Sequence, residues 1–151
     1  MQKNLQQKIR FNHCTEVQIR FNDIDIAGHV NNEVYFSYFN YGRMIYFKDL
    51  NSDFDWQQFG LVLVTMNIDF FEPVFINDKI KVCTKITTIG NKSIEMIQHV
   101  IKESEEDPVV VASCKSVLVG YDYKEKVSLP IPENWKEMIV NFEKNVVLKS
   151  K

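Results

Sequence analysis

The sequence has few cysteines, prolines and glycines, and it has no long apolar run. Its 151 residues include four Pro, five Gly and three Cys, at positions 14, 83 and 114. The cysteines lie far apart and form no CxxC pair, so we expect neither a disulfide nor a zinc site. No segment approaches the roughly 18 consecutive apolar residues that a membrane-spanning helix needs. The polar N-terminus lacks the apolar core of a signal peptide, and we therefore expect a cytoplasmic protein. Because the His and Cys residues show no metal-ligand spacing, we expect no bound metal, and we expect no cofactor.

The chain also lacks an excess of one charge. Lys and Arg number 18 and Asp and Glu number 20, a formal net charge of -2. Such a balance argues against nucleic acid as the main partner. With 45% hydrophobic and 25% charged residues, we expect one soluble globular domain over residues 1–151, with an ordered core of about residues 15–143. Eleven Phe, six Tyr and two Trp indicate a buried interface or an apolar pocket in addition to the core.

The order of the elements predicts an α+β protein. Alternation over Thr15–Asn22 predicts a strand with Val17, Ile19 and Phe21 on its buried face. Two series at helical spacing predict a helix from Asn31 or Asn32 to about Lys48: Val34, Tyr38, Tyr41, Ile45 and Tyr35, Phe39, Gly42, Tyr46. Gly42 indicates a close approach by a strand. A helical turn from Phe54 is expected before the strands begin.

Beyond Gly60 the apolar period changes to two, which predicts an antiparallel meander. The expected strands are residues 66–70, 80–86, 93–102 and 109–123, followed by a short tail helix with Trp135, Met138, Ile139 and Phe142 on one face. By the rules of layer packing, this sheet wraps the single long helix. The last strand is apolar on both faces, so we expect a second protomer to cover its other side.

The stretch from Arg20 to Arg43 concentrates the groups that can do chemistry. Asp23 and Asp25 stand one residue apart, Gly28 permits a sharp turn, and residues 29–32 (HVNN) lead into the predicted helix. A carboxylate beside the unpaired N–H groups of a helix start can act as base or nucleophile while those amides hold an oxyanion. The sequence contains no GxSxG elbow and no Ser-His-Asp pattern, so a serine hydrolase is not supported.

Several of these residues have a structural alternative. Asp23 is explained more simply as a loop-closing or helix-capping carboxylate than as a second catalyst. His29 is either a proton shuttle or substrate contact, or a structural side chain bonded to the loop. The side chains of Asn31 and Asn32 are first of all helix caps. Tyr35 either belongs to the core or lines an acyl tunnel.

Residues 20–47, RFNDIDIAGHVNNEVYFSYFNYGRMIYF, resemble the signature of the 4-hydroxybenzoyl-CoA thioesterase-like family of hot-dog acyl-CoA thioesterases. The later stretch DFFEPVFINDKIKV (residues 69–82), the Gly-x-x-Ser at residues 90–93 and the Pro-x-Pro-Glu before the tail helix are similar to further family motifs. The likeness covers roughly residues 15–140. The sequence departs from the family where Asn40 replaces a common Glu and Asn77 a common Gly, and its HVNN variant leaves the acyl group open.

The resemblance implies a hot-dog fold, an antiparallel β-sheet wrapped around one long central helix, and hydrolysis of an acyl-CoA to a free acid and coenzyme A. Its catalytic carboxylate falls on Asp25 and its oxyanion N–H near Asn32. The expected substrate contacts are Gly28, His29, Val30, Asn31 and Tyr35. The resemblance also implies a homodimer or homotetramer with sites at the subunit interface. Arg43 is explained most simply by a pairing with an acid across that interface. Two alternatives stay open: a thioesterase for acyl carrier protein (ACP), and a non-catalytic acyl-thioester binding protein.

Overall fold

The computed structural model describes residues 9–51 and 60–150 of the chain. Within these ranges the backbone forms a sheet and two α-helices. The elements in chain order are β1 (His13–Val17), the short 3-10 helix η1 (Phe21–Asp23), α2 (Asn32–Leu50), β2 (Gly60–Phe70), β3 (Ile80–Ile89), β4 (Ser93–Lys102), β5 (Val109–Asp122), β6 (Val127–Ser128), α3 (Glu133–Glu143) and β7 (Val147–Leu148). The helical turn predicted from Phe54 and most of the predicted N-terminal arm lie outside the described residues.

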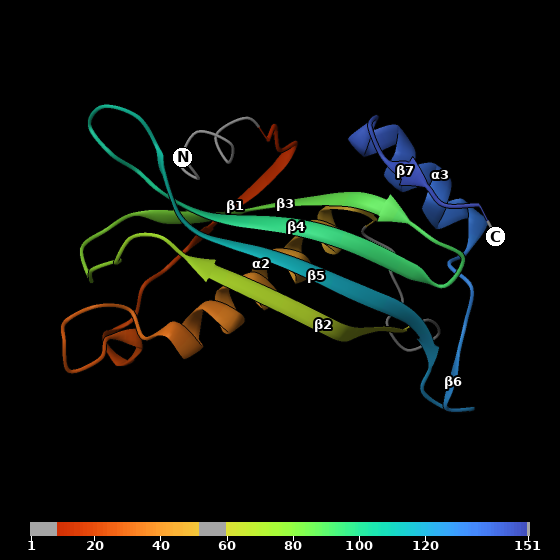
Figure 1. Ribbon diagram of the computed structural model, residues 1–151, viewed down its shortest axis with the longest axis horizontal. Helices are drawn as coiled ribbons and strands as arrows, with labels where there is room; N and C mark the ends of the chain where they lie inside the picture. The colour runs from red at the N-terminus through yellow and green to blue at the C-terminus, as the bar shows by residue number, and fades with distance from the viewer. Residues whose placement is uncertain (1–8, 52–59, 151) are drawn as a thin grey trace.

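The sheet has the strand order β1-β3-β4-β5-β2, and all of these neighbours are antiparallel (Figure 1). The two-residue strands β6 and β7 extend it by pairing with β5 and β3, β7 in parallel. The predicted α+β class and the antiparallel meander are confirmed. Because β2 ends the order, it leaves one backbone edge unpaired within the described sheet. Neither α2 nor α3 combines the length and apolar character that crossing a membrane requires.

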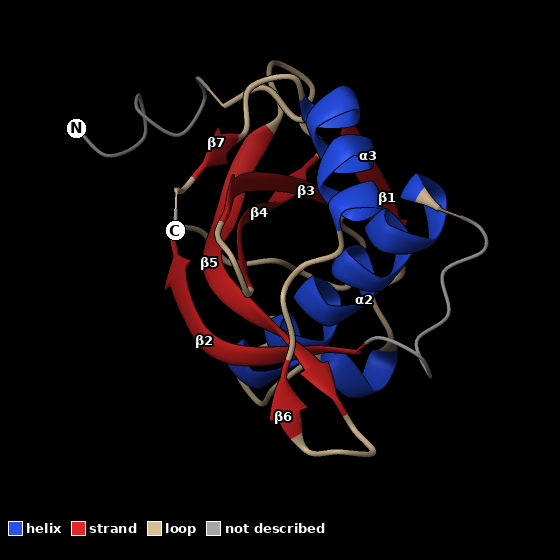
Figure 2. Ribbon diagram, turned by 90° about the vertical axis from the view of Figure 1, so that its right-hand side faces the viewer, coloured by secondary structure: helices blue, strands red, loops and turns tan. Residues whose placement is uncertain are grey.

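The long helix α2 lies in the concave side of the curved sheet (Figure 2). Its sheet-facing series is the second one predicted: Tyr35, Phe39, Gly42 and Tyr46 are all buried. In the other series Tyr38 is buried, but Tyr41 is 42% exposed. A period of about 3.6 residues per turn rotates Tyr41 by about 100° from its neighbour Gly42, away from the face that meets the sheet.

Gly42 lies at a close contact between α2 and the sheet. A Cβ atom at this position would lie 2.5 Å from Cγ1 of Val82 in β3. The close approach inferred from the sequence is therefore confirmed, and it explains why the residue without a side chain stands within an otherwise aromatic helix.

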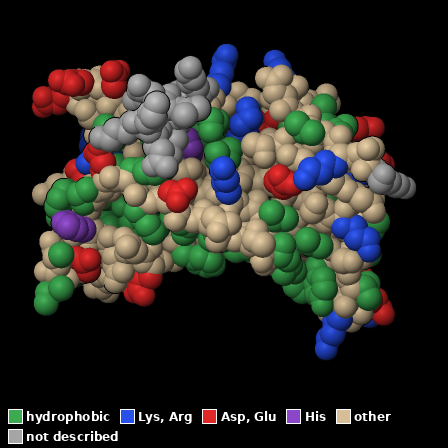
Figure 3. Space-filling view, in the orientation of Figure 1, with side chains coloured by type: hydrophobic (Ala, Val, Ile, Leu, Met, Phe, Trp, Pro, Cys, Tyr) green, Lys and Arg blue, Asp and Glu red, His purple; other side chains and the backbone are tan. Residues whose placement is uncertain are grey.

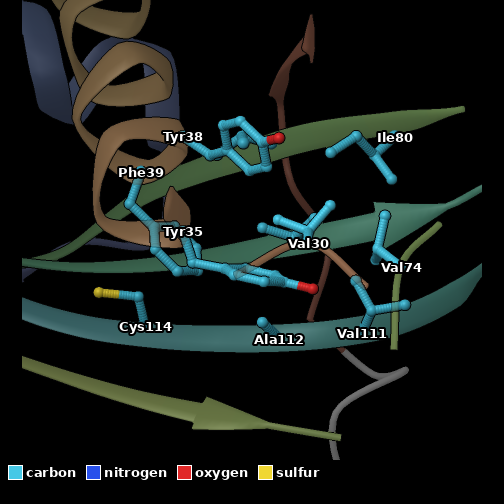
Figure 4. Close-up of a cluster of buried hydrophobic side chains, with 11 residues drawn as sticks. Val30, Tyr35, Tyr38, Phe39, Val74, Ile80, Val111, Ala112 and Cys114 are labelled. Carbon is cyan, nitrogen blue, oxygen red and sulfur yellow. The ribbon is translucent and has the colours of Figure 1, made fainter. Parts of the chain in front are cut away.

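The core consists of two clusters along α2. The first surrounds the helix start and includes Tyr35, Tyr38 and Phe39 with apolar side chains of β3, β4 and β5 (Figure 4). The second surrounds the helix end and includes Trp135 and Ile139 of α3, which lie on the helix face predicted to be apolar. Between the helices, the Tyr46 hydroxyl donates to Oε1 of the buried Glu143 at 2.6 Å. The second cluster therefore anchors α3 to the far end of α2.

The first predicted strand is partly wrong. β1 spans His13–Val17 rather than Thr15–Asn22, and the chain then turns through η1. Phe21, predicted to be buried, is 86% exposed. The alternation continues past Val17 in the sequence, but β1 pairs with β3 only through Val17 opposite Ile80, where β3 begins.

The expectation of no disulfide is also wrong. Cys14 of β1 and Cys83 of β3 are bonded, although 69 positions separate them in the sequence. They are opposite each other in the β1–β3 register. Distance along the chain gave no sign of this pairing, because two strands remote in sequence become neighbours in the sheet. Cys114 remains a free, buried thiol.

Candidate active site

Asp23 anchors the loop between β1 and α2. Its side chain is 1% exposed, and the carboxylate accepts hydrogen bonds from the backbone N–H of Arg20 at 2.9 Å and from the Tyr38 hydroxyl at 2.7 Å. The Arg20 guanidinium donates to the other oxygen at 3.0 Å. The Asp23 carbonyl accepts from the N–H of Asn31 at 2.8 Å. Since Tyr38 belongs to α2, Asp23 fixes the loop against the helix.

These contacts set the protonation of Asp23 and Tyr38. Burial by itself would raise the pKa of Asp23, but hydrogen bonds from Arg20 and Tyr38, together with the Arg20 charge, lower it below its usual value. Burial and the hydrogen bond to Asp23 raise the pKa of Tyr38 well above its usual value. Asp23 is thus an ionised acceptor with its donors in place, as the structural alternative predicted.

Asp25 occupies the turn that follows. Its Oδ1 accepts from the N–H groups of Ala27 at 2.9 Å and His29 at 3.2 Å, while the second oxygen, Oδ2, bonds to none of the described residues. The Asp25 N–H donates to the His29 carbonyl at 2.8 Å. Gly28 completes the turn with φ +86°, a left-handed conformation that side chains disfavour. The loop therefore holds one carboxylate oxygen and leaves the other available.

The start of α2 lies directly after this turn. Asn31 is the N-cap, and its side-chain oxygen accepts from the N–H of Glu33 at 3.3 Å. The N–H of Val30 donates to the Val74 carbonyl at 2.8 Å, which ties the helix start to the turn after β2. The N–H of Asn32, the first helical residue, donates to no described acceptor. It is therefore one of the open donors at the positive end of the helix dipole.

A cavity of about 330 Å³ brings Asp25 and Asn32 together. Five of the seven residues predicted for the site line this cavity: Asp25, His29, Val30, Asn32 and Tyr35. Gly28 and Asn31 do not line it. Their positions assign them to the turn and to the helix cap, respectively.

The remaining lining of this cavity, residues 70–73, was missed as a site from the sequence. The Phe70 ring packs edge-on against Tyr35 at 5.1 Å between centroids, and on the next turn Phe75 packs in the same manner against His29 at 5.2 Å. Two adjacent aromatics before Pro73 are a usable signal. Placing them beside the helix start, however, requires knowing that β2 pairs with β5, and that is a property of the folded sheet.

Metal-ligating side chains do not gather in this region. Over residues 9–51 and 60–150, no group of three or more His, Cys, Asp or Glu side chains is arranged to hold a metal ion. The described cavity is lined by a carboxylate and by the start of a helix, with aromatic side chains beside them.

The cavity and its helix belong to a stretch that matches known proteins. A model of the thioesterase-like superfamily matches residues 19–139. The long-chain acyl-CoA thioesterase FadM of Escherichia coli (strain K12) is 24% identical over 128 residues, which cover 83% of this chain and 95% of that protein.

Solved structures show the same architecture. A thioesterase from Thermus thermophilus, crystallised with coenzyme A and Zn, is 30% identical; the match covers 89% of this chain and 96% of that chain, with a TM-score of 0.77. A mutant 4-hydroxybenzoyl-CoA thioesterase in complex with 4-hydroxybenzoyl-CoA is 19% identical, with coverage of 84% and 98% and a TM-score of 0.77. These likenesses confirm the predicted hot-dog fold.

Proposed function

Because the chain belongs to the thioesterase-like superfamily, we propose that it hydrolyses acyl-CoA thioesters with Asp25 as its catalytic carboxylate. The observation that carries the proposal is the shared cavity, which is lined both by Asp25 and by Asn32, whose backbone N–H is open. One group supplies a base or nucleophile, and the other a donor for the carbonyl oxygen. Thioester hydrolysis needs both.

The proposed reaction begins with the thioester carbonyl oxygen at the start of α2. The Asn32 N–H donates to that oxygen, and its bond strengthens as negative charge develops there. The free Oδ2 of Asp25 either removes a proton from an attacking water or attacks the carbonyl carbon itself, forming a mixed anhydride that a water molecule then hydrolyses. In both routes the C–S bond breaks, the water supplies the new oxygen of the carboxylic acid, and coenzyme A leaves as its thiol after its sulfur takes up a proton derived from that water. His29, on the cavity wall, is the proposed contact to the substrate near the leaving sulfur.

The loop architecture supports these roles. Asp25 keeps its orientation through two backbone donors to Oδ1, and Asp23 fixes the loop to α2 through Tyr38. A preorganised carboxylate and donor pay no reorganisation cost at the moment of reaction. Binding of an apolar acyl group displaces water from around Asp25, and desolvation makes a carboxylate a stronger base.

We also propose that the active form is a homo-oligomer whose sites lie at the subunit boundary. β2 has an open edge in the described sheet, and hydrophobic side chains line the hollowed lower margin of the molecule beneath it (Figure 3). Val64 and Phe70 of β2 are 52% and 43% exposed, and Phe36 of α2 is 45% exposed. A second copy paired along this edge would cover them.

Arg43 does not add support for this assembly. Its Nη2 donates to Oδ1 of Asn40, and burial lowers the pKa of the guanidinium. Its Nη1 has no partner among the described residues but is buried within the chain, so the pairing expected with an acid across the interface stays a prediction. We further propose that the enzyme is cytoplasmic. Because disulfides are rare in that compartment, recovery of the intact Cys14–Cys83 bond from freshly lysed, thiol-blocked cells would contradict this placement.

The test is release of free coenzyme A thiol from a panel of acyl-CoAs, run beside the same acyl groups on ACP. The proposal predicts turnover of at least one acyl-CoA. Faster turnover of the ACP-bound thioester in direct competition would identify acyl-ACP, rather than acyl-CoA, as the substrate. Tight acyl-CoA binding without turnover at any acyl length would make the protein a binding module instead.

A further inference from the structure

The cavity beside Asp25 ends at a wall of two aromatic rings. Tyr35 and Phe70 line it, and their rings meet edge-on, with centroids 5.1 Å apart at 84°. Tyr35 is 2% exposed, so only a small part of its side chain reaches the cavity. Phe70 faces the helix because it is opposite Ala112 in the β2–β5 register, and Ala112 is a core residue.

The space behind this wall is already filled. Phe39 of α2 and Ala112 and Cys114 of β5 are each 0% exposed and belong to the same core cluster as Tyr35. In Figure 4 the ring of Tyr35 extends from α2 over β5, Phe39 lies one helical turn further along α2, and Cys114 lies on β5. A protein interior packed in this way has no room for additional methylene groups without displacing side chains.

The cavity itself is small for a substrate site. Its 330 Å³ lies at the low end of the range of about 300–1,000 Å³ that is usual for small-molecule sites. That volume must hold the thioester as well as the acyl group. A long aliphatic chain would therefore have to extend beyond the cavity, whereas a compact acyl group could stay inside.

We propose that Tyr35 and Phe70 close the acyl site and restrict this enzyme to coenzyme A thioesters of compact acids, short or aromatic. This rests on the proposed thioesterase activity and adds the substrate class. Edge-on contact with two rings favours an aromatic acyl group in particular. The Tyr35 hydroxyl has no partner among the described residues, and burial raises its pKa to about 12, so it remains a protonated donor inside the pocket.

The experiment compares kcat/KM for acetyl-, hexanoyl-, benzoyl- and palmitoyl-CoA, all below the concentration at which palmitoyl-CoA forms micelles. The wild type is expected to turn over the best compact substrate at least about tenfold faster than palmitoyl-CoA, since even one methylene in a filled pocket costs about that factor. Phe70→Ala, which opens the wall, is expected to raise the palmitoyl-to-benzoyl ratio of kcat/KM by about tenfold or more.

Two further variants and a control keep the test decisive. Tyr35→Leu removes the other ring and is expected to shift the ratio in the same direction, whereas Tyr35→Phe keeps the ring and the wild-type ratio. Tyr41→Ala truncates a ring of similar exposure (42% against 43% for Phe70) that does not line this cavity, so its ratio should equal that of the wild type.

The outcomes separate the two proposals. If the wild type prefers palmitoyl-CoA, or if Phe70→Ala and Tyr35→Leu keep the wild-type palmitoyl-to-benzoyl ratio, the proposed restriction by Tyr35 and Phe70 is wrong. The proposed thioesterase activity would not be affected by that result. Absence of turnover on all four substrates would overturn both. The proposal is supported if the wild type prefers compact acyl groups, if Phe70→Ala and Tyr35→Leu weaken that preference in kcat/KM, and if Tyr41→Ala leaves it unchanged.

Discussion

Asp23 and Asp25 are carboxylates of one loop in opposite environments. Asp23 is buried with donors on both oxygens, whereas Asp25 is half-buried and has an oxygen without a described partner. The two side chains share a chemistry, but only the second lines the cavity. The first therefore stabilises the loop, and the second is the proposed catalytic carboxylate.

The environment of Asp23 predicts a pH-dependent contribution to stability. Replacing it as Asp23→Asn should lower the free energy of unfolding at neutral pH by about 1–3 kcal/mol, because the charged acceptor of Tyr38 and Arg20 is lost. Since its pKa is lowered in the fold, the ionised form stabilises the protein above the ordinary Asp pKa of about 3.9 and less as the pH falls through the folded value. Urea unfolding of the wild type and Asp23→Asn at pH 7, 5, 4 and 3 measures the loss of unfolding free energy and its dependence on pH.

The expected signature is a gap between the wild type and Asp23→Asn that is constant from pH 7 to 5 and closes below pH 4. Tyr38→Phe, which removes one donor and keeps the ring, should show a smaller gap. A gap independent of pH would mean that the carboxylate does not stabilise the fold through its charge.

At the scale of the element, α2 combines a strong helical pattern with one very close contact to the sheet. Gly42 places the helix against Val82, and a Cβ there would lie 2.5 Å from Cγ1 of Val82. Gly42→Ala gains about 1 kcal/mol of helix propensity but should still destabilise the protein, since a packed core absorbs an added methyl at a cost of roughly 1–3 kcal/mol. Thermal or denaturant unfolding of the variant shows whether the free energy of unfolding falls, as expected, or rises.

The matched experiment adds space on the strand. The double variant Gly42→Ala/Val82→Ala should be less destabilised than the sum of its two single variants, because the deleted methyl groups make room for the new one. Strict additivity would contradict the proposed contact.

The bond between Cys14 and Cys83 ties the edge strand β1 to β3. Cys14→Ser should lower the free energy of unfolding by about 2–4 kcal/mol under non-reducing conditions, the usual contribution of a disulfide that closes a long loop. With a reductant present, wild type and variant should become similar. A count of thiols in denaturant should give one before reduction and three after; three without reductant would contradict the bond.

The elements also show where sequence reasoning works. Periodicity located α2 and β4 closely, because each pattern extends over ten residues or more and matches one buried face. β1 was misjudged because its end is set by the start of β3, its partner. The Cys14–Cys83 pair was missed for a related reason: the spacing of residues along the chain does not determine which distant strands pair or in which register.

At the scale of the molecule, the open edge of β2 predicts a dimer. Val64→Asp places a charge on this edge at a bulged residue that is 52% exposed, and it should reduce the mass in sedimentation from two chains to one. Val147→Asp on β7, where the native side chain is 59% exposed, is the control and should leave the mass unchanged. If the Val64→Asp variant remained a dimer, the subunit interface would not lie along the β2 edge.

The candidate site illustrates the same division between local and assembled features. The loop from Asp23 to Asn32 could be predicted as a site because its residues are contiguous, and the turn and helix cap are local chemistry. Phe70 and Tyr35 could not be joined from the sequence, since they belong to different elements far apart along the chain. The half of the site built by the sheet becomes visible only in the fold.

The most direct measurement is kcat for Asp25→Asn on the best acyl-CoA substrate, beside Asp122→Asn. Asp122 holds its own turn through two backbone N–H groups, as Asp25 does, and lies outside the cavity. The roles assigned here predict that Asp25→Asn loses about 10²–10⁴ in kcat with an unchanged fold, while Asp122→Asn keeps wild-type activity. An Asp25→Asn enzyme that retained most of its kcat would contradict the assignment of the catalytic carboxylate.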